Sequence, residues 1–396
     1  MVNQTYQPMT EANFIALAQK RYAELQALNK IDNFYDYEKE FESIWRDLGR
    51  EVLESNLSDI PADRRKKKTL TKFGRISINK THSFSEGANG FQISPHLQEL
   101  LVYAGQLDCY ERCNVILEKF IDIEVSASQV YLVTDCYGKG AEKEVNVCRS
   151  LEPVKKTEVL YVEADGSMLL TRDEGWKEVK VGRMFTSGSC IDPNGKASWI
   201  RHSQYVAHLG NSKDFTKHMD TLIESYGRLG KRLVFISDGG TWIKNWIEDA
   251  FPQAVSILDY YHVCEHLHQF ANTLFTDEEE LKKWTDEQKE LLLQSKVMEV
   301  IANIKQQDCE SKDALALINY YTNNAYRMDY QAYKNIGAGL IGSGAIESAH
   351  RTVVQKRMKQ SGQRWSNQGA QNMLNLRVLT MNQQWDKVVQ LIKRAA

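Results

Sequence analysis

The 396-residue chain has few residues that stiffen or cross-link a polypeptide. It contains only six prolines, which favours long helices and few extended linkers. Its seven cysteines are scattered and odd in number, and no CxxC pair is present. Neither a disulfide framework nor a zinc ribbon is therefore indicated, and we expect reduced thiols.

Long apolar segments are also missing. No run of about 18 apolar residues occurs, so we expect no membrane span. The start, MVNQTYQPMTEANF, lacks the basic-then-apolar layout of a signal peptide, which predicts a cytoplasmic protein. The composition, 42% hydrophobic and 26% charged, is that of an ordinary globular protein, and the length predicts about two or three domains.

The net charge of −2 gives no argument for a nucleic-acid partner, but the distribution of charge does. Residues 64–85 hold eight Lys or Arg and no Asp or Glu, and residues 348–385 hold six and none. Two segregated basic segments suit a surface that binds a polyanion, although two solvated basic surfaces would look the same. The residues that we expect to contact DNA are Arg64, Arg65, Lys66, Lys67, Lys68, Lys72, Arg75, Arg351, Lys356, Arg357, Lys359 and Arg364.

The N-terminal part has helical periodicity. Apolar residues recur at helical spacing over residues 10–56, and three further helical patterns follow over residues 95–137. The tight junction at residues 122–124 is compatible with a helix-turn-helix. Any small three-helix bundle would give the same pattern, so both interpretations stay open.

The pattern changes after residue 150. EVLYVEADGSMLLTR predicts a strand, a tight turn at the Asp-Gly pair and a second strand, and WKEVKVGRMFTS predicts a third. Helix, strand, helix, strand and helix follow up to about residue 275. A three-stranded meander followed by this alternation predicts an α/β fold with a mixed sheet, as in ribonuclease-H-like proteins. Residues 275–335 are helical, and further helix is expected from Ile346.

We therefore predict four regions. They are an N-terminal helical region (1–60), a basic DNA-binding region (61–150), a ribonuclease-H-like catalytic core (151–274 and 336–385) and a helical insertion (275–335).

Three carboxylates occupy positions that suit a metal site. Asp165 is expected to close the first strand and Asp238 the buried strand RLVFIS, while Glu347 starts a helix after a Gly-Ser-Gly turn. Carboxylates at the rim of a sheet can hold magnesium or manganese, and two such ions can promote phosphoryl transfer. Asp-Gly is also a common turn dipeptide, and a glutamate in a first helical turn is favoured by the helix dipole.

The sequence resembles DDE transposases of bacterial insertion sequences, in the Mutator-related group, with Kra-type and Lre-type relatives. Three blocks carry the resemblance, and they span roughly residues 160–380: VEADGSMLLTR, ISDGGTWIKNWIEDAFPQAVSILDYYHVCEHL and GSGAIESAHRTVVQKRMKQSGQRWSNQGAQNMLNLR. One departure concerns the stretch TKFGRISINKTHSFSEGANGFQISP, which lacks the cysteines that many relatives carry there. A zinc-stabilised DNA-binding element is therefore doubtful.

The resemblance implies a function and a set of residues. Asp165, Asp238 and Glu347 would be the catalytic and metal-binding triad, holding two magnesium or manganese ions. Asp259 and His262 match the family's D-x2-H element, an auxiliary to the active site. Partners would be double-stranded DNA, as terminal inverted repeats and target, and further copies of the chain when two ends are paired. The location would be the bacterial cytoplasm, at the nucleoid.

Other interpretations remain open. HVCEH fits the H-x-x-E-H pattern of zinc proteases, although no third ligand is identifiable. Asp259 lies three residues before His262 on a helical face, which suits a carboxylate–imidazole pair. A non-catalytic DNA-binding protein derived from a transposase, or a ribonuclease-H-like nuclease without strand transfer, would carry many of the same features.

Overall fold

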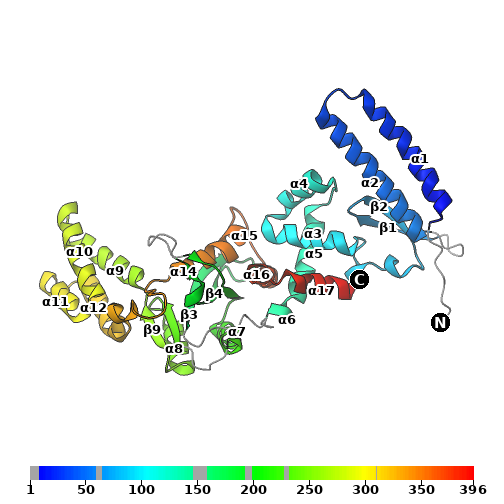
Figure 1. Ribbon diagram of the computed structural model, residues 1–396. Helices are drawn as coiled ribbons and strands as arrows, with labels where there is room; N and C mark the ends of the chain where they lie inside the picture. Colours follow the sequence, from blue (N-terminus) through cyan, green and yellow to red (C-terminus); the bar gives the residue numbers. More distant parts are fainter. Residues whose placement is uncertain (1–8, 59–64, 146–157, 192–198, 227–231, 309) are drawn as a thin grey trace. The chain divides into compact units, whose positions relative to one another are not determined.

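The computed structural model describes residues 9–58, 65–145, 158–191, 199–226, 232–308 and 310–396. The chain forms two compact units, one of Met1–Ala141 with Trp385–Ala396 and the other of Glu142–Gln384 (Figure 1). None of the helices within the described ranges combines the length and apolarity that crossing a bilayer requires.

The first unit begins with a helical hairpin. Its elements are α1 (Glu11–Ala27), η1 (Leu28–Lys30) and α2 (Phe34–Ser58). The side chain of Thr10 accepts a hydrogen bond from the Asn13 amide and caps α1. Arg21 is buried between the helices and donates to Glu51 of α2 at 2.6 Å. The helical prediction for residues 10–56 is confirmed, with a break after Lys30.

A small hairpin and a helical group complete this unit. The elements are β1 (Lys66–Thr71), β2 (Gly74–Asn79), η2 (Ser83–Ser85), η3 (Ala88–Gly90), α3 (Pro95–Leu107), α4 (Tyr110–Ile121), α5 (Ala127–Gly140) and the C-terminal α17 (Trp385–Ala395). A capping box of Ser126 and Gln129 starts α5, and α17 packs on α3 and α5. The three predicted helices are confirmed, while their role as a DNA-binding helix-turn-helix stays a prediction.

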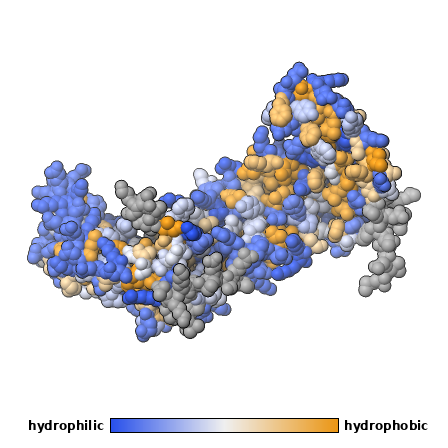
Figure 2. Space-filling view, viewed as in Figure 1, coloured by the Kyte–Doolittle hydropathy of each residue, from blue (hydrophilic) through white to orange (hydrophobic). Residues whose placement is uncertain are grey.

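Apolar side chains are visible on the surface of the first unit in Figure 2. Large exposed ones include Phe34, Tyr35 and Trp45 of α2 and Phe120 of α4. Exposed apolar residues are common on protein surfaces, so their exposure does not by itself indicate a binding site.

The second unit is built on a five-stranded mixed sheet in the order β7-β4-β3-β8-β9. The strands are β3 (Val159–Leu170), β4 (Trp176–Thr186), β7 (Gln204–Leu209), β8 (Arg232–Ser237) and β9 (Val255–Leu258). β3, β4 and β7 are antiparallel neighbours, whereas β8 runs parallel to β3 and β9 parallel to β8. A separate two-stranded pair is formed by β5 (Cys190–Ile191) and β6 (Trp199–Ile200).

The structure corrects the predicted meander. β3 continues through Asp165 and Gly166 without a turn, because its pairing with β4 runs unbroken from Leu160 to Leu170. A Cβ atom on Gly166 would collide with the Glu178 side chain of β4, so the glycine leaves space for that side chain within the strand and does not form a turn. The third antiparallel strand is β7, which the sequence analysis did not assign.

Helices cover both faces of this sheet. α7 (Ser212–Ser225) and α8 (Thr241–Ala250) pack on one face, where the core includes Val162, Phe235 and Trp246. The opposite face meets α9 (Tyr260–Leu274) and residues of the helical group that follows it. That group is α10 (Glu278–Leu293), α11 (Val297–Gln307), α12 (Lys312–Asn324), η5 (Ala325–Arg327) and α13 (Tyr330–Tyr333), so the helical prediction for 275–335 is confirmed.

The C-terminal part of the unit returns to the sheet. Its elements are α14 (Gly344–Ala349), the π-helical turn η6 (His350–Gln355), α15 (Lys356–Met358) and α16 (Asn367–Met381), and α6 (Glu142–Val145) belongs to the same unit. α14 contacts β3 and β4, and α16 contacts β7. Ser366 caps α16 by accepting from the Gly369 amide at 3.0 Å.

Candidate active site

Two acidic residues lie level with each other on neighbouring parallel strands. β3 pairs with β8 in a register that sets Glu163 opposite Ile236. Two residues further along each chain come Asp165, within β3, and Asp238, directly after β8. The prediction that Asp165 closes its strand is therefore wrong, because β3 continues to Leu170. The neighbouring strand β8 does end at this level, so Asp165 lies beside a strand end.

The charge of Asp165 is disfavoured by its surroundings. Burial is the main reason why the pKa of this carboxyl is raised to about 6, and the negative charges of Asp238 and Glu178 raise it further. The amide of Gly166, which donates to Asp165 at 2.7 Å, and the imidazole of His262 act in the opposite direction. The site thus concentrates negative charge that a cation would stabilise.

A buried arginine forms hydrogen bonds with the end of β8. Arg327 is fully buried and donates to the Ser237 hydroxyl at 2.8 Å and to the Asp238 carbonyl at 3.4 Å. The Asp238 carboxylate accepts from the Gly240 amide at 2.9 Å. Both interactions fix the backbone that presents Asp238.

A third carboxyl, Glu163, lies two residues before Asp165 and on the same face of β3. It is fully buried, and burial raises its pKa to about 8. Its Oε2 accepts from the Ile346 amide at 2.7 Å, while the nearby charges of Asp259 and Glu347 disfavour its ionised form. Sequence reasoning missed this residue, although its spacing from Asp165 is a usable signal.

Glu347 stands apart from the two aspartates. It is exposed on α14, and its negative charge acts on Glu163, whose ionised form it disfavours. In the ranges that the structure describes, no three His, Cys, Asp or Glu side chains gather closely enough to hold a metal ion. The structure therefore brings Asp165 and Asp238 together and leaves Glu347 beside Glu163. The oxygen donors of the two aspartates suit a hard divalent cation in their chemistry.

Asp259 and His262 have separate partners. Asp259 is buried as the N-cap of α9 and accepts from the Tyr261 amide at 3.0 Å and from the Ser343 hydroxyl at 2.5 Å. His262 lies with Nδ1 3.4 Å from Glu265 and Nε2 3.2 Å from Nε2 of His266. The predicted carboxylate–imidazole pair is thus replaced by other contacts, because the capping role turns Asp259 toward its own backbone. His262 still lies close enough to lower the pKa of Asp165.

Two further side chains surround the aspartates and were not predicted. His350 is buried, with Nδ1 3.0 Å from the Ser167 hydroxyl and Nε2 3.5 Å from an Asp165 oxygen, and burial lowers its pKa to about 4. Tyr320 of α12 lies beside Gly239, where burial raises its pKa and the nearby charge of Asp238 raises it further. Its ring centre is 4.7 Å from that of His266. His350 and Tyr320 belong to segments far from β3 in sequence, so no local sequence pattern predicts that they lie at this site.

The basic residues predicted to contact DNA are mostly exposed. In the first unit Lys67 is partly exposed and Arg65, Lys66, Lys68, Lys72 and Arg75 are exposed, and in the second Arg351, Lys356, Lys359 and Arg364 are exposed. Arg357 is a correction: only 1% of it is exposed, and its guanidinium lies 5.0 Å from the ring centre of Trp365. It packs within the unit and does not offer its charge at the surface. Arg64 lies outside the described residues.

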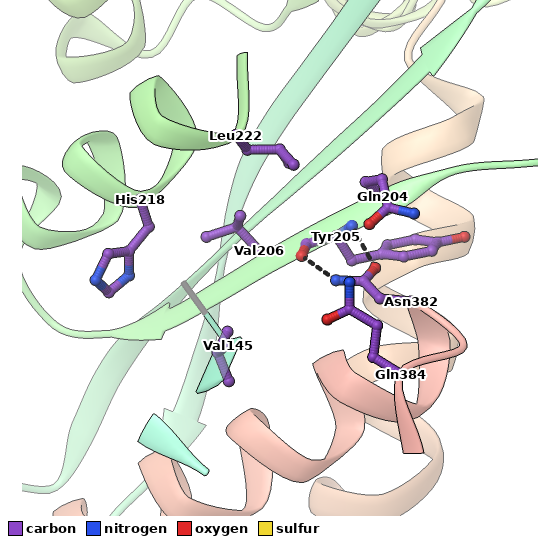
Figure 3. Close-up of a pocket in the computed structure, with 8 residues that line it drawn as sticks. All are labelled: Val145, Gln204, Tyr205, Val206, His218, Leu222, Asn382 and Gln384. Atoms are coloured by element: carbon purple, nitrogen blue, oxygen red, sulfur yellow. Dashed lines mark hydrogen bonds between the residues drawn. The ribbon is translucent and has the colours of Figure 1, made fainter. Parts of the chain in front are cut away.

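A small pocket lies elsewhere in the second unit (Figure 3). Val206 and Leu222 line it and belong to the core on the α7–α8 face, to which Ala164 also points. Because side chains alternate along a strand, Asp165 and Glu163 point to the other face. Asn382 closes the pocket through two hydrogen bonds with the backbone of Tyr205, at 2.8 and 3.0 Å. This pocket is not part of the carboxylate site.

Comparisons with known proteins place the chain among relatives. Residues 60–395 match a family described as "Uncharacterised protein family (UPF0236)". A UPF0236 protein in the vanSb 3′ region of Streptococcus gallolyticus is 22% identical over 335 residues, which is 78% of this chain and 71% of the relative. Among solved structures, the chain is similar to the Drosophila P element transposase strand transfer complex, with 9% identity over 74% of this chain and 80% of that chain. The TM-score of this match is 0.28.

Proposed function

We propose that this chain, which belongs to the uncharacterised protein family UPF0236, is a DDE transposase of a bacterial insertion sequence, in the Mutator-related group with Kra-type and Lre-type relatives. It would bind the ends of its element, hydrolyse the phosphodiester there and join the freed 3′-hydroxyl to target DNA. The observation that carries the proposal is that Asp165, within β3, and Asp238, directly after the parallel neighbour β8, lie at the same level of the sheet.

The topology supports a ribonuclease-H-like core. Three antiparallel strands are followed by two strands parallel to the first, with the sheet order β7-β4-β3-β8-β9 and helices on both faces. The helical group from α10 to α13 separates β9 and α9 from α14, as expected of an insertion that interrupts such a core. Acidic residues on the first strand and after the fourth lie where this kind of core would carry its chemistry.

The proposed roles follow from position and charge. Asp165 and Asp238 would hold magnesium or manganese, and Glu347 would complete the ligand set when its exposed side chain turns toward them. Bound cations would activate the attacking oxygen and stabilise the leaving oxygen. Asp259 would hold the turn before α14 through Ser343, and His262 would offset part of the negative charge around Asp165.

The DNA contacts would come from exposed cations in each unit. The β1–β2 hairpin presents Lys66, Lys68, Lys72 and Arg75, and α15 and its C-cap present Lys356 and Lys359. Such contacts bind phosphates without reading sequence, so they would position DNA and not select it. Two copies of the chain would be needed to pair two element ends.

The separate placement of Glu347 favours a second candidate, a DNA-binding protein derived from a transposase that has no catalytic role. A ribonuclease-H-like nuclease without strand transfer is the other alternative. The three functions differ in their products.

One assay distinguishes them. Purified full-length protein is mixed with magnesium, a target plasmid and labelled DNA that carries the sequences flanking its own gene. A transposase shifts, nicks and joins this DNA; a nuclease nicks it without joined product; a non-catalytic binder only shifts it. We expect joined product from the wild type and none from the Asp238→Asn variant, and nicking that persists undiminished in that variant would refute the assignment.

A further inference from the structure

Glu163 and Arg183 face each other across two antiparallel strands. The β3–β4 register places them directly opposite, and both are buried, with 0% and 7% of their surfaces exposed. A carboxyl and a guanidinium are costly to bury, and their burial is tolerated where hydrogen bonds satisfy them.

The two side chains hold the two ends of one peptide group. Arg183 Nη1 donates to the Ala345 carbonyl at 2.8 Å, and the Ile346 amide donates to Glu163 Oε2 at 2.7 Å. The carbonyl of residue 345 and the amide of residue 346 belong to the same peptide bond. We name this arrangement, Glu163 and Arg183 on the Ala345–Ile346 peptide, the peptide clamp.

Arg183 is itself held in place. Its Nε donates to the Ser203 hydroxyl at 2.9 Å, and its guanidinium lies 5.7 Å and 5.4 Å from the ring centres of Phe185 and Tyr205. A guanidinium confined in this way presents its remaining donors in one direction. The half of the clamp that Arg183 supplies is therefore fixed in place on β4.

The segment that the clamp holds would otherwise be poorly ordered. Residues 335–345, NIGAGLIGSGA, contain four glycines, which lose much conformational freedom when they are ordered. Tyr161 fixes its beginning, because its hydroxyl donates to the Ile336 carbonyl at 2.7 Å and accepts from the Ala338 amide at 3.0 Å. The clamp fixes its end, and the next residue is Glu347.

We propose that Glu163 and Arg183 are positioning residues that set the place of Glu347 relative to Asp165 and Asp238. This inference rests on the proposed function, because it assigns the clamp to the third ligand of the same site. The clamp ties the first turn of α14 to β3 and β4, the strands that also carry Asp165 and its neighbours. Loss of the clamp would free Glu347 while leaving both aspartates in the sheet.

The test compares two substitutions of one residue. Glu163→Leu removes the nearer of the two acceptors of the Ile346 amide and leaves the Ser343 carbonyl at 3.0 Å, whereas Glu163→Gln keeps a side-chain oxygen that can accept the same bond. Thr285→Val serves as the control for general destabilisation, because Thr285 is a buried hydroxyl in the helical insertion, bonded to the Leu281 carbonyl at 2.9 Å. Hydrogen exchange of the Ile346 amide, Mn²⁺ affinity by calorimetry and the rate of nicking are measured for the full-length protein.

We expect Glu163→Leu to speed exchange of the Ile346 amide and to weaken Mn²⁺ binding by about 10-fold or more, as is usual when a residue that orients a ligand is lost. Glu163→Gln should retain slow exchange and stay close to wild type in affinity, and Thr285→Val should change neither quantity. Should Glu163→Leu fail to fold, Arg183→Met, which releases only the carbonyl end of the peptide, replaces it and should weaken Mn²⁺ binding in the same sense.

Three outcomes would overturn the proposal. They are wild-type exchange at Ile346 in Glu163→Leu, unchanged Mn²⁺ affinity in Glu163→Leu, and an equal loss of affinity in Thr285→Val. A wild-type protein that neither binds Mn²⁺ nor nicks DNA would instead refute the proposed function. In that case the positioning role falls with it, and the exchange measurement still decides whether the clamp holds the peptide.

Discussion

The Ser343 hydroxyl donates to the buried carboxylate of Asp259 at 2.5 Å and so joins two segments that lie 84 positions apart. Asp259 is the N-cap of α9, and Ser343 immediately precedes α14. This hydrogen bond links the end of β9 to the helix that carries Glu347, and it gives the D-x2-H element a structural role that does not involve His262.

Removing the hydroxyl should destabilise the second unit. In Ser343→Ala, one Asp259 oxygen loses its donor while it stays buried, which costs about 1–3 kcal/mol of unfolding free energy. Ser348→Ala is the matched control, because Ser348 is exposed on the same helix. Denaturant unfolding of both variants measures the difference, and equal stabilities would contradict the role given to Ser343.

The two glycines that flank Ser343 should respond differently to alanine. A Cβ atom on Gly342 would collide with the ring of Tyr261, whereas one on Gly344 would meet no atom within 4 Å. We expect Gly342→Ala to lower the unfolding free energy by about 1–3 kcal/mol through overpacking. Gly344→Ala should be neutral or stabilising by up to about 1 kcal/mol, because alanine favours the start of the helix. Thermal unfolding of the two variants checks this, and a reversed order would show that the turn is packed otherwise.

Arg327 should be among the residues whose loss costs most. Its buried guanidinium donates to the Ser237 hydroxyl and to the carbonyls of Ser237, Asp238 and Ile257, so its removal takes a donor away from each of these oxygens. We expect Arg327→Met to lower the unfolding free energy by about 3–5 kcal/mol or to prevent folding. Arg201→Met, at an exposed arginine of the same unit, should stay within about 0.5 kcal/mol of wild type. Soluble yield and urea unfolding report both results.

A pair of histidines should make stability depend on pH. His208 and His218 lie with ring centres 6.0 Å apart, and burial lowers the pKa of both below the usual value of 6.5. Asp214 and Glu142 oppose this shift for both imidazoles, Lys180 adds to it at His208, and Lys217 adds to it at His218.

The sign follows from proton uptake. Because the folded pKa values are depressed, the unfolded chain binds more protons just below pH 6.5, and stability is lost as the pH falls through that value toward the folded pKa values. The double variant His208→Gln, His218→Gln should lose less stability than wild type between about pH 7.5 and about pH 5.5. His268→Gln, at an exposed position of α9, should leave the wild-type slope unchanged. A double variant with the full wild-type slope would rule out these histidines as its source.

Local sequence signals predicted most elements of the second unit but not how the first strand continues. The apolar run of β8 and the helices on either side of β9 follow from hydrophobic periodicity. The Asp-Gly pair at 165–166 predicts a turn, because that dipeptide favours turns in isolation. Pairing with the whole length of β4 overrides this preference, which only the tertiary structure reveals.

The candidate site was predictable only in part. Asp165 and Asp238 could be chosen because each follows an apolar strand pattern, and the parallel register brings them level. Glu163 has only its two-residue spacing from Asp165 as a signal, whereas Arg183 and Arg327 depend on contacts between segments that are distant in sequence. Arg357 shows the opposite error. The basic sequence around it predicts an exposed charge, but the structure buries its guanidinium against Trp365.

The central claim is that Asp165 and Asp238 together bind a divalent cation. Calorimetric titration with Mn²⁺ tests this most directly, using the wild type, Asp238→Asn and, as control, Asp249→Asn at an exposed position at the end of α8. Binding that is present in the wild type and in the control and is lost or weakened by about 10-fold or more in Asp238→Asn is the predicted result. Equal Mn²⁺ affinity in all three proteins, or none in the wild type, would contradict the account.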